Sequence, residues 1–181
     1  MQYIIISIVS VVVIIVASVA AGFTLINHEY KERTKILEST QASPRMALVV
    51  YQPSITPASS DVAHAIAKGL NDSGFEVKLT TPGKHLSTDI SAYSVVVFGS
   101  PNYGGSVAVA LSNYVDRIDD FSGKTIILFT TSGRIDNMLE LEKLALLLHD
   151  VTPYEVVKFE ANDTEHNKAV AYQLGVDTAN Q

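Results

Sequence analysis

The chain has 181 residues, with 13 Lys and Arg against 19 Asp and Glu and a formal net charge of −6. This length suits one domain with an appendage, and the acidic balance argues against nucleic acid as a partner. The sequence contains no cysteine, which excludes disulfides, thiolate metal sites and a cysteine nucleophile.

The first segment, Tyr3 to Ile26, is apolar and contains no charged residue. A helix of about 24 residues would extend roughly 36 Å, enough to cross a hydrocarbon core of about 30 Å. We therefore expect a transmembrane helix over residues 1–27. A cleaved signal peptide is the alternative, but that class normally has a basic start and a shorter apolar stretch.

The basic residues beside this segment predict its orientation. Lys31, Arg33 and Lys35 all follow the apolar run, and basic flanks prefer the cytoplasmic side of a membrane. We expect a single-pass protein of the cell membrane whose globular domain faces the cytoplasm. Residues 28–45 are predicted to form a juxtamembrane helix, as far as Ile36, followed by a linker.

The domain is expected to span residues 46–181, where short apolar runs alternate with helical stripes. The predicted strands are Met46–Tyr51, Phe75–Leu79, Tyr93–Phe98, Thr125–Thr130 and Tyr154–Phe159. Helices are predicted near residues 59–70, 107–118, 138–148 and 163–174, the first of them capped by Ser59 or Ser60. This alternation predicts an α/β fold, a doubly wound parallel sheet of five strands with helices on both faces.

Three loops of this sheet offer groups that suit a mononucleotide. They leave the carboxyl ends of the first, third and fourth strands, and in the order 2-1-3-4-5 the first and third strands diverge there to form a crevice. The first loop supplies hydroxyl groups and helix N-terminal amides, which suit a phosphate. The other two supply an aromatic side chain, Tyr103, and glycine backbone, which suit a flat ring.

The stretch Phe98–Gly105, Phe-Gly-Ser-Pro-Asn-Tyr-Gly-Gly, resembles the flavodoxin family, as do Val49–Tyr51 with the loop after them and Thr130–Gly133. The resemblance implies a flavodoxin-like fold that binds FMN without a covalent bond. The cofactor-binding residues that it implies are Ser54, Thr56, Ala58, Ser59, Ser60, Ser100, Pro101, Asn102, Tyr103, Gly104, Gly105, Thr131, Ser132 and Gly133. Pro57 stands where the family has a glycine, and proline has no N–H to donate to a phosphate.

By this resemblance the protein is a membrane-anchored carrier of electrons, with redox partner proteins or quinone as its partners. Two alternatives stay open. A flavin-free module that serves interaction or scaffolding is favoured by Pro57, whereas an NAD(P)H-dependent quinone or flavin reductase lacks a recognisable pyridine-nucleotide loop. We assign no catalytic side chain and expect no metal site, because the five histidines are spread singly along the chain.

Overall fold

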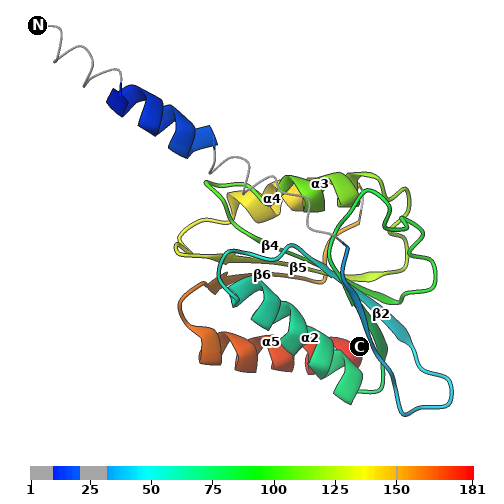
Figure 1. Ribbon diagram of the computed structural model, residues 1–181. Coiled ribbons are helices and arrows are strands. Elements are labelled where there is room, and N and C mark those ends of the chain that lie inside the picture. The colour runs from blue at the N-terminus through cyan, green and yellow to red at the C-terminus, as the bar shows by residue number, and fades with distance from the viewer. Residues whose placement is uncertain (1–9, 21–31, 150) are drawn as a thin grey trace, which may run out of the picture.

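The computed structural model describes residues 10–20, 32–149 and 151–181, and its centre is a six-stranded sheet between two layers of helices (Figure 1). The strands are β1 (Thr34–Leu37), β2 (Met46–Tyr51), β3 (Glu76–Thr80), β4 (Val95–Pro101), β5 (Thr125–Ser132) and β6 (Glu155–Glu160). The helices that pack on the sheet are α2 (Ala58–Asp72), α3 (Val109–Asp116), α4 (Leu139–Leu146) and α5 (Thr164–Ala179).

The predicted parallel sheet is confirmed, with one strand added. Strands β3, β2, β4, β5 and β6 lie side by side and run parallel, which is the predicted order 2-1-3-4-5. Every residue of β4 is buried, as its unbroken apolar sequence indicated. The carboxyl ends of β2 and β4 lie next to each other, where Tyr51 pairs with Gly99.

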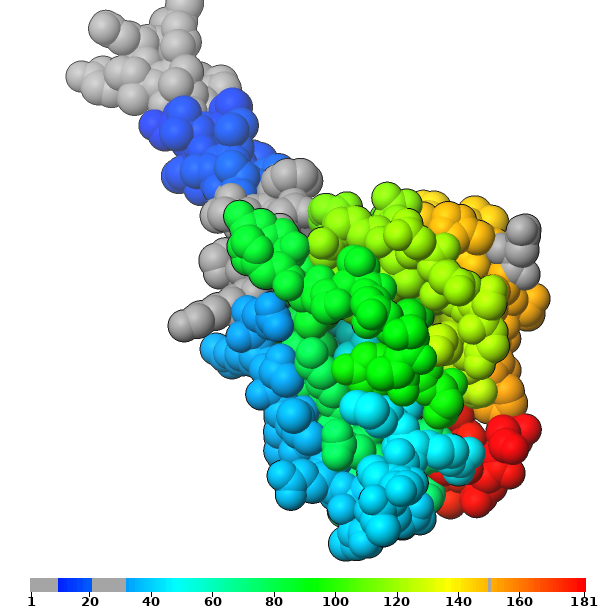
Figure 2. Space-filling model, turned by 90° about the vertical axis from the view of Figure 1, so that its right-hand side faces the viewer, coloured from blue at the N-terminus to red at the C-terminus, as the bar shows by residue number. Residues whose placement is uncertain are grey.

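The sixth strand, β1, corrects the expected juxtamembrane helix. Residues Thr34–Leu37 run antiparallel to β3 at the edge of the sheet, and Thr34 pairs with Thr80. Figure 2 shows this blue segment lying against the green segment that follows β3, where the Arg33 and Thr81 backbones are also bonded. Without β1, the outer edge of β3 would leave its backbone groups unpaired, so long-range pairing outweighs the local helical pattern here.

The segment between β1 and β2, expected to be a linker, packs against the domain. The Arg45 guanidinium lies 4.3 Å from the centre of the Phe75 ring and donates a hydrogen bond to the Ala179 carbonyl at 2.5 Å. Ser39 Oγ donates to the Gly74 carbonyl at 2.8 Å. The folded structure therefore begins by Thr34 and not at Met46.

Each face of the sheet is covered by one pair of helices (Figure 1). Side chains such as Val49, Val97 and Phe129 pack against α2 and α5 on one face. Their alternate neighbours, such as Phe98 and Leu128, pack against α3 and α4 on the other. Because successive side chains of a strand point to opposite faces, residues at the end of each strand are divided between the same two layers.

Residues 10–20 form a helix whose side chains are all exposed. The remainder of the predicted transmembrane segment, and residues 28–31 of the predicted juxtamembrane helix, lie outside the described residues. Within the described ranges, no helix combines the length and the apolar character that a membrane crossing requires.

Candidate functional site

Two adjoining cavities lie where the loops after β2, β4 and β5 meet. The first, which we call the hydroxyl cavity, has a volume of about 230 Å³ and is lined by Ser54, Ile55, Thr56, Pro101, Asn102, Tyr103, Thr131, Ser132, Gly133 and Ala161. The second, the glycine cavity, has a volume of about 430 Å³ and is lined by Asn102, Gly104, Gly105, Ser132, Gly133, Arg134, Asn137, Leu139 and Lys158. They share Asn102, Ser132 and Gly133, so together they form one depression at the predicted edge of the sheet.

The hydroxyl cavity suits an anion that is held without a cationic side chain. Of the described residues that line it, none is charged. Ser54 Oγ donates to the Thr56 carbonyl at 2.5 Å, which bends the loop before α2 and leaves the Thr56 side chain exposed. The first-turn N–H groups of α2 have no intrahelical acceptors, and they carry the positive end of the helix dipole.

The start of α2 differs from the expected one. Pro57 occupies the N-cap position with φ −70° and ψ −7°, and Ala58 begins the helix, so neither Ser59 nor Ser60 caps it. The fixed φ of proline is already close to the helical value, which makes it compatible with this position. Because Pro57 lacks an N–H, the first amide donor of α2 is that of Ala58.

Three expected site residues at the start of α2 do not line either cavity. Ala58 is buried, and Ser59 is fully buried with its Oγ 2.6 Å from Thr131 Oγ1. Ser60 Oγ lies 3.4 Å from the Tyr51 hydroxyl and 3.3 Å from His64 Nδ1. The Ser59 hydroxyl thus joins α2 to β5, and the Ser60 hydroxyl lies between Tyr51 of β2 and His64 of α2.

The loop after β4 is shaped by hydrogen bonds from polar side chains. Ser100, a fourth expected residue outside both cavities, is fully buried, and its Oγ accepts a hydrogen bond from the Ala108 N–H at 2.9 Å. Asn102 Oδ1 accepts one from the Gly105 N–H at 2.8 Å, and the Asn102 N–H donates to the Thr131 carbonyl at 2.9 Å. These bonds fix the loop against β5 and bring the second and third loops together.

The glycines of these loops leave open space above the backbone. Gly104 and Gly105 have φ of +62° and +85°, a conformation that side chains with a Cβ rarely adopt. At Gly104, Gly105 and Gly133, apart from the glycine and its two chain neighbours, no atom of the described chain lies within 4 Å of where a Cβ would stand. A flat ligand could therefore approach the main chain closely. Tyr103 lines the hydroxyl cavity and not the glycine cavity.

Two charged residues that the sequence analysis missed lie beside this site. Lys158 Nζ is 2.8 Å from Glu140 Oε1, and the two side chains are 3% and 0% exposed. Thr130 Oγ1 also donates to Glu140 Oε1, at 2.9 Å. Burial alone would raise the pKa of Glu140, but hydrogen bonds from Lys158, the backbone and Thr130 lower it on balance. The sequence signal for this pair is an acidic residue between the two leucines that begin α4, Glu140, and a single basic residue within β6, Lys158.

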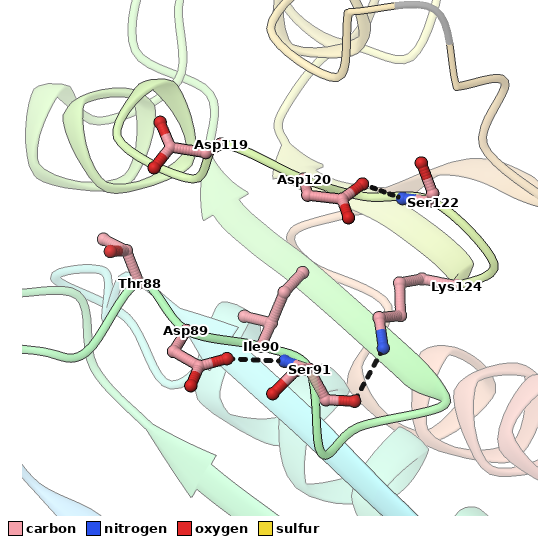
Figure 3. A pocket seen from close by; sticks show the side chains of 8 residues that line it. All are labelled: Thr88, Asp89, Ile90, Ser91, Asp119, Asp120, Ser122 and Lys124. Carbon is pink, nitrogen blue, oxygen red and sulfur yellow. Dashed lines mark hydrogen bonds between the residues drawn. The ribbon is translucent and has the colours of Figure 1, made fainter.

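Another depression, of about 390 Å³, lies at the amino ends of β4 and β5 (Figure 3). Its carboxylates take part in local turns, since Asp89 accepts a hydrogen bond from the Ser91 N–H and Asp120 accepts one from the Ser122 N–H. Hydrogen bonding with the serine side chain, followed by this backbone bond, lowers the pKa of each aspartate. In the part of the chain that the structure describes, no group of three or more His, Asp or Glu is placed to hold a metal ion.

The doubly wound sheet, with its cavity where β2 and β4 diverge, defines a flavodoxin-like α/β domain. Residues 60–150, half of the chain, match the family model of NADPH-dependent FMN reductases, and the chain belongs to that family. Membership makes a flavin the expected cofactor. Among curated proteins, none matches the chain.

Several solved structures share the fold. The flavodiiron core of Flv1 from Synechocystis sp. PCC6803 superposes with a TM-score of 0.64 at 18% identity, over 78% of this chain and 37% of that one. Flavodoxin from Megasphaera elsdenii gives a TM-score of 0.63 at 18% identity, over 75% and 100%. The NAD(P)H:quinone oxidoreductase from Methanothermobacter marburgensis gives a TM-score of 0.53 at 14% identity, over 75% of this chain and 99% of that one. This chain spans little more than a third of the first of these proteins.

Proposed function

We propose that this domain binds FMN non-covalently at the joined cavities and passes electrons from NADPH to a redox partner, either a quinone or a protein. The observation that carries the proposal is the pairing of an uncharged hydroxyl cavity with an open, glycine-lined one. The first suits the phosphate of a mononucleotide and the second its flat ring. The family match supports NADPH as the source of the electrons.

The residues present fit FMN. The Thr56 hydroxyl, before the positive end of the α2 dipole, would hold the phosphate in place of a cationic side chain. Gly104, Gly105 and Gly133 leave room for the ring, where a Cβ would otherwise stand. Bound FMN would supply the capacity to accept a hydride and to release electrons, while the chain binds the ring, orients it and limits its contact with water.

A visible spectrum of the purified protein tests the cofactor. We expect the purified protein to show the two absorption bands of an oxidised flavin. When FMN is added to the apoprotein, we expect the fluorescence of FMN to be quenched. Anaerobic addition of NADPH should then bleach the bands. Bleaching by a chemical reductant but not by NADPH would favour a carrier that receives electrons from another protein. If FMN does not bind, the flavin-free interaction module is the better interpretation.

We also propose that the apolar segment Tyr3–Ile26 anchors the domain to the cytoplasmic side of the cell membrane. The absence of charge over this segment and the basic residues that follow it support the proposal. A variant without residues 1–31 keeps β1, so it should fold and leave the membrane fraction. A variant without residues 1–45 would lose β1 and is not a suitable comparison.

A further inference from the structure

The ion pair between Lys158 and Glu140 is buried on the side of the sheet that carries α3 and α4. Glu140 belongs to α4, Lys158 to β6, and Thr130, which bonds the same carboxylate oxygen, to β5. The second oxygen, Glu140 Oε2, is buried and has no hydrogen-bond partner among the described residues. The Lys158 and Thr130 side chains therefore both hold the carboxylate through Oε1.

Stability alone gives a weak reason for such a pair. Removing two charges from water costs several kcal/mol for each ion, and apolar residues of similar volume often stabilise a core equally well. Glu140 thus holds the Lys158 ammonium at a place that solvent scarcely reaches.

The position of this ammonium relates it to the candidate site. Lys158 lines the glycine cavity, and its Nζ donates to the Asn137 carbonyl at 2.6 Å in the loop that forms one wall of that cavity. Arg134 lines the same cavity, but its side chain is 80% exposed and paired with Asp136. Water screens the charge of Arg134 far more strongly than that of Lys158.

We propose that Lys158, held in place by Glu140, stabilises the negative charge that a flavin in the glycine cavity acquires on reduction. This inference rests on the proposed binding of FMN. A hydride from NADPH brings two electrons and one proton to the oxidised ring and leaves NADP⁺, so the product, FMNH⁻, carries one additional negative charge. A nearby cation favours that product and raises the reduction potential of the flavin.

Single variants of the two partners should shift the potential in opposite directions. Lys158→Met removes the positive charge, whereas Glu140→Gln removes the negative charge that offsets it. We expect Lys158→Met to reduce the equilibrium ratio of FMNH⁻ to FMN about tenfold, which lowers the two-electron midpoint potential by about 30 mV. Glu140→Gln should raise it, because the ammonium is then no longer offset by a carboxylate 2.8 Å away.

The experiment equilibrates the FMN-loaded full-length protein with a reference dye, and titrates FMN into the apoprotein by fluorescence. Arg134→Gln is the matched control, and we expect it to change the ratio less than twofold. The double variant Lys158→Met/Glu140→Gln leaves no unpaired buried charge, so it should fold and give a potential between those of the singles. Lys158→Arg retains the charge and should stay near the unmutated protein.

The outcomes separate this inference from the proposed function. Opposite shifts in the two singles support it. Shifts of the same sign, or an unchanged potential with weaker FMN binding, would mean that Lys158 only holds the loop through Asn137, and the inference would be wrong. If the unmutated protein binds no FMN, both the proposed function and the inference are overturned.

Discussion

The Thr56 hydroxyl provides the most direct test of which cavity holds a phosphate. It lies in the hydroxyl cavity, on an exposed side chain, and its Oγ1 is 3.5 Å from Ser54 Oγ. Because this contact is at the limit of a hydrogen bond, Thr56→Ala should change the free energy of unfolding by no more than about 0.5 kcal/mol. A change in ligand affinity would then report binding and not folding.

The expected loss follows from the charge of the ligand. A hydrogen bond to a charged group contributes about 1.5–3 kcal/mol, so Thr56→Ala should weaken FMN about 10- to 150-fold. Riboflavin lacks the phosphate, and its affinity should hardly change. Fluorescence titration of the apoprotein with each flavin measures both values.

Ser60→Ala is the matched comparison. This hydroxyl also stands at the start of α2, but it contacts Tyr51 and His64 and does not line the cavity. We expect the affinity of Ser60→Ala for FMN to remain within about twofold of that of the unmutated protein. Equal losses of FMN and riboflavin in Thr56→Ala would refute the assignment of the phosphate to the hydroxyl cavity.

Four further predictions concern the site and its support. Tyr103 lines the hydroxyl cavity, which is assigned to the phosphate, so Tyr103→Ala should weaken FMN more than riboflavin in the same titrations. Pro57→Gly restores an amide donor, and we expect tighter FMN but unchanged riboflavin; looser FMN would contradict this. In Gly69→Ala the new Cβ would stand 2.2 Å from the Tyr172 carbonyl oxygen, so α2 and α5 must separate. We expect the free energy of unfolding to fall by about 1–3 kcal/mol and Tm to fall by about 2–4 °C for each kcal/mol. An unchanged melting curve would contradict this prediction. The lowered pKa of Glu140 means that its ionised form stabilises the fold above the ordinary value of 4.5 and that this contribution is lost as the pH falls. In urea unfolding between about pH 3 and pH 6, the free energy of unfolding of Glu140→Gln should therefore fall less with decreasing pH than that of the unmutated protein.

The sequence by itself determined the parallel core and the edge at which the candidate site lies. Apolar runs such as Val95–Phe98 identify buried strands because both faces of such a strand are covered, and this needs no knowledge of distant residues. The glycines and Pro101 mark where β4 ends, since they interrupt regular structure locally. Once the strand order was predicted, the meeting of the three loops followed from topology.

Only the tertiary structure decided which polar groups face the cavities. Ser59 looked equivalent to Thr56 in the sequence, but a hydrogen bond to Thr131, on a strand far along the chain, buries it. β1 forms because the edge of β3 offers unpaired backbone groups, which outweigh the local preference of four residues. The pairing of Lys158 with Glu140 likewise depends on how β6 and α4 pack together. Local sequence patterns do not indicate such contacts, because the energy of these contacts arises only when distant segments exclude water between them.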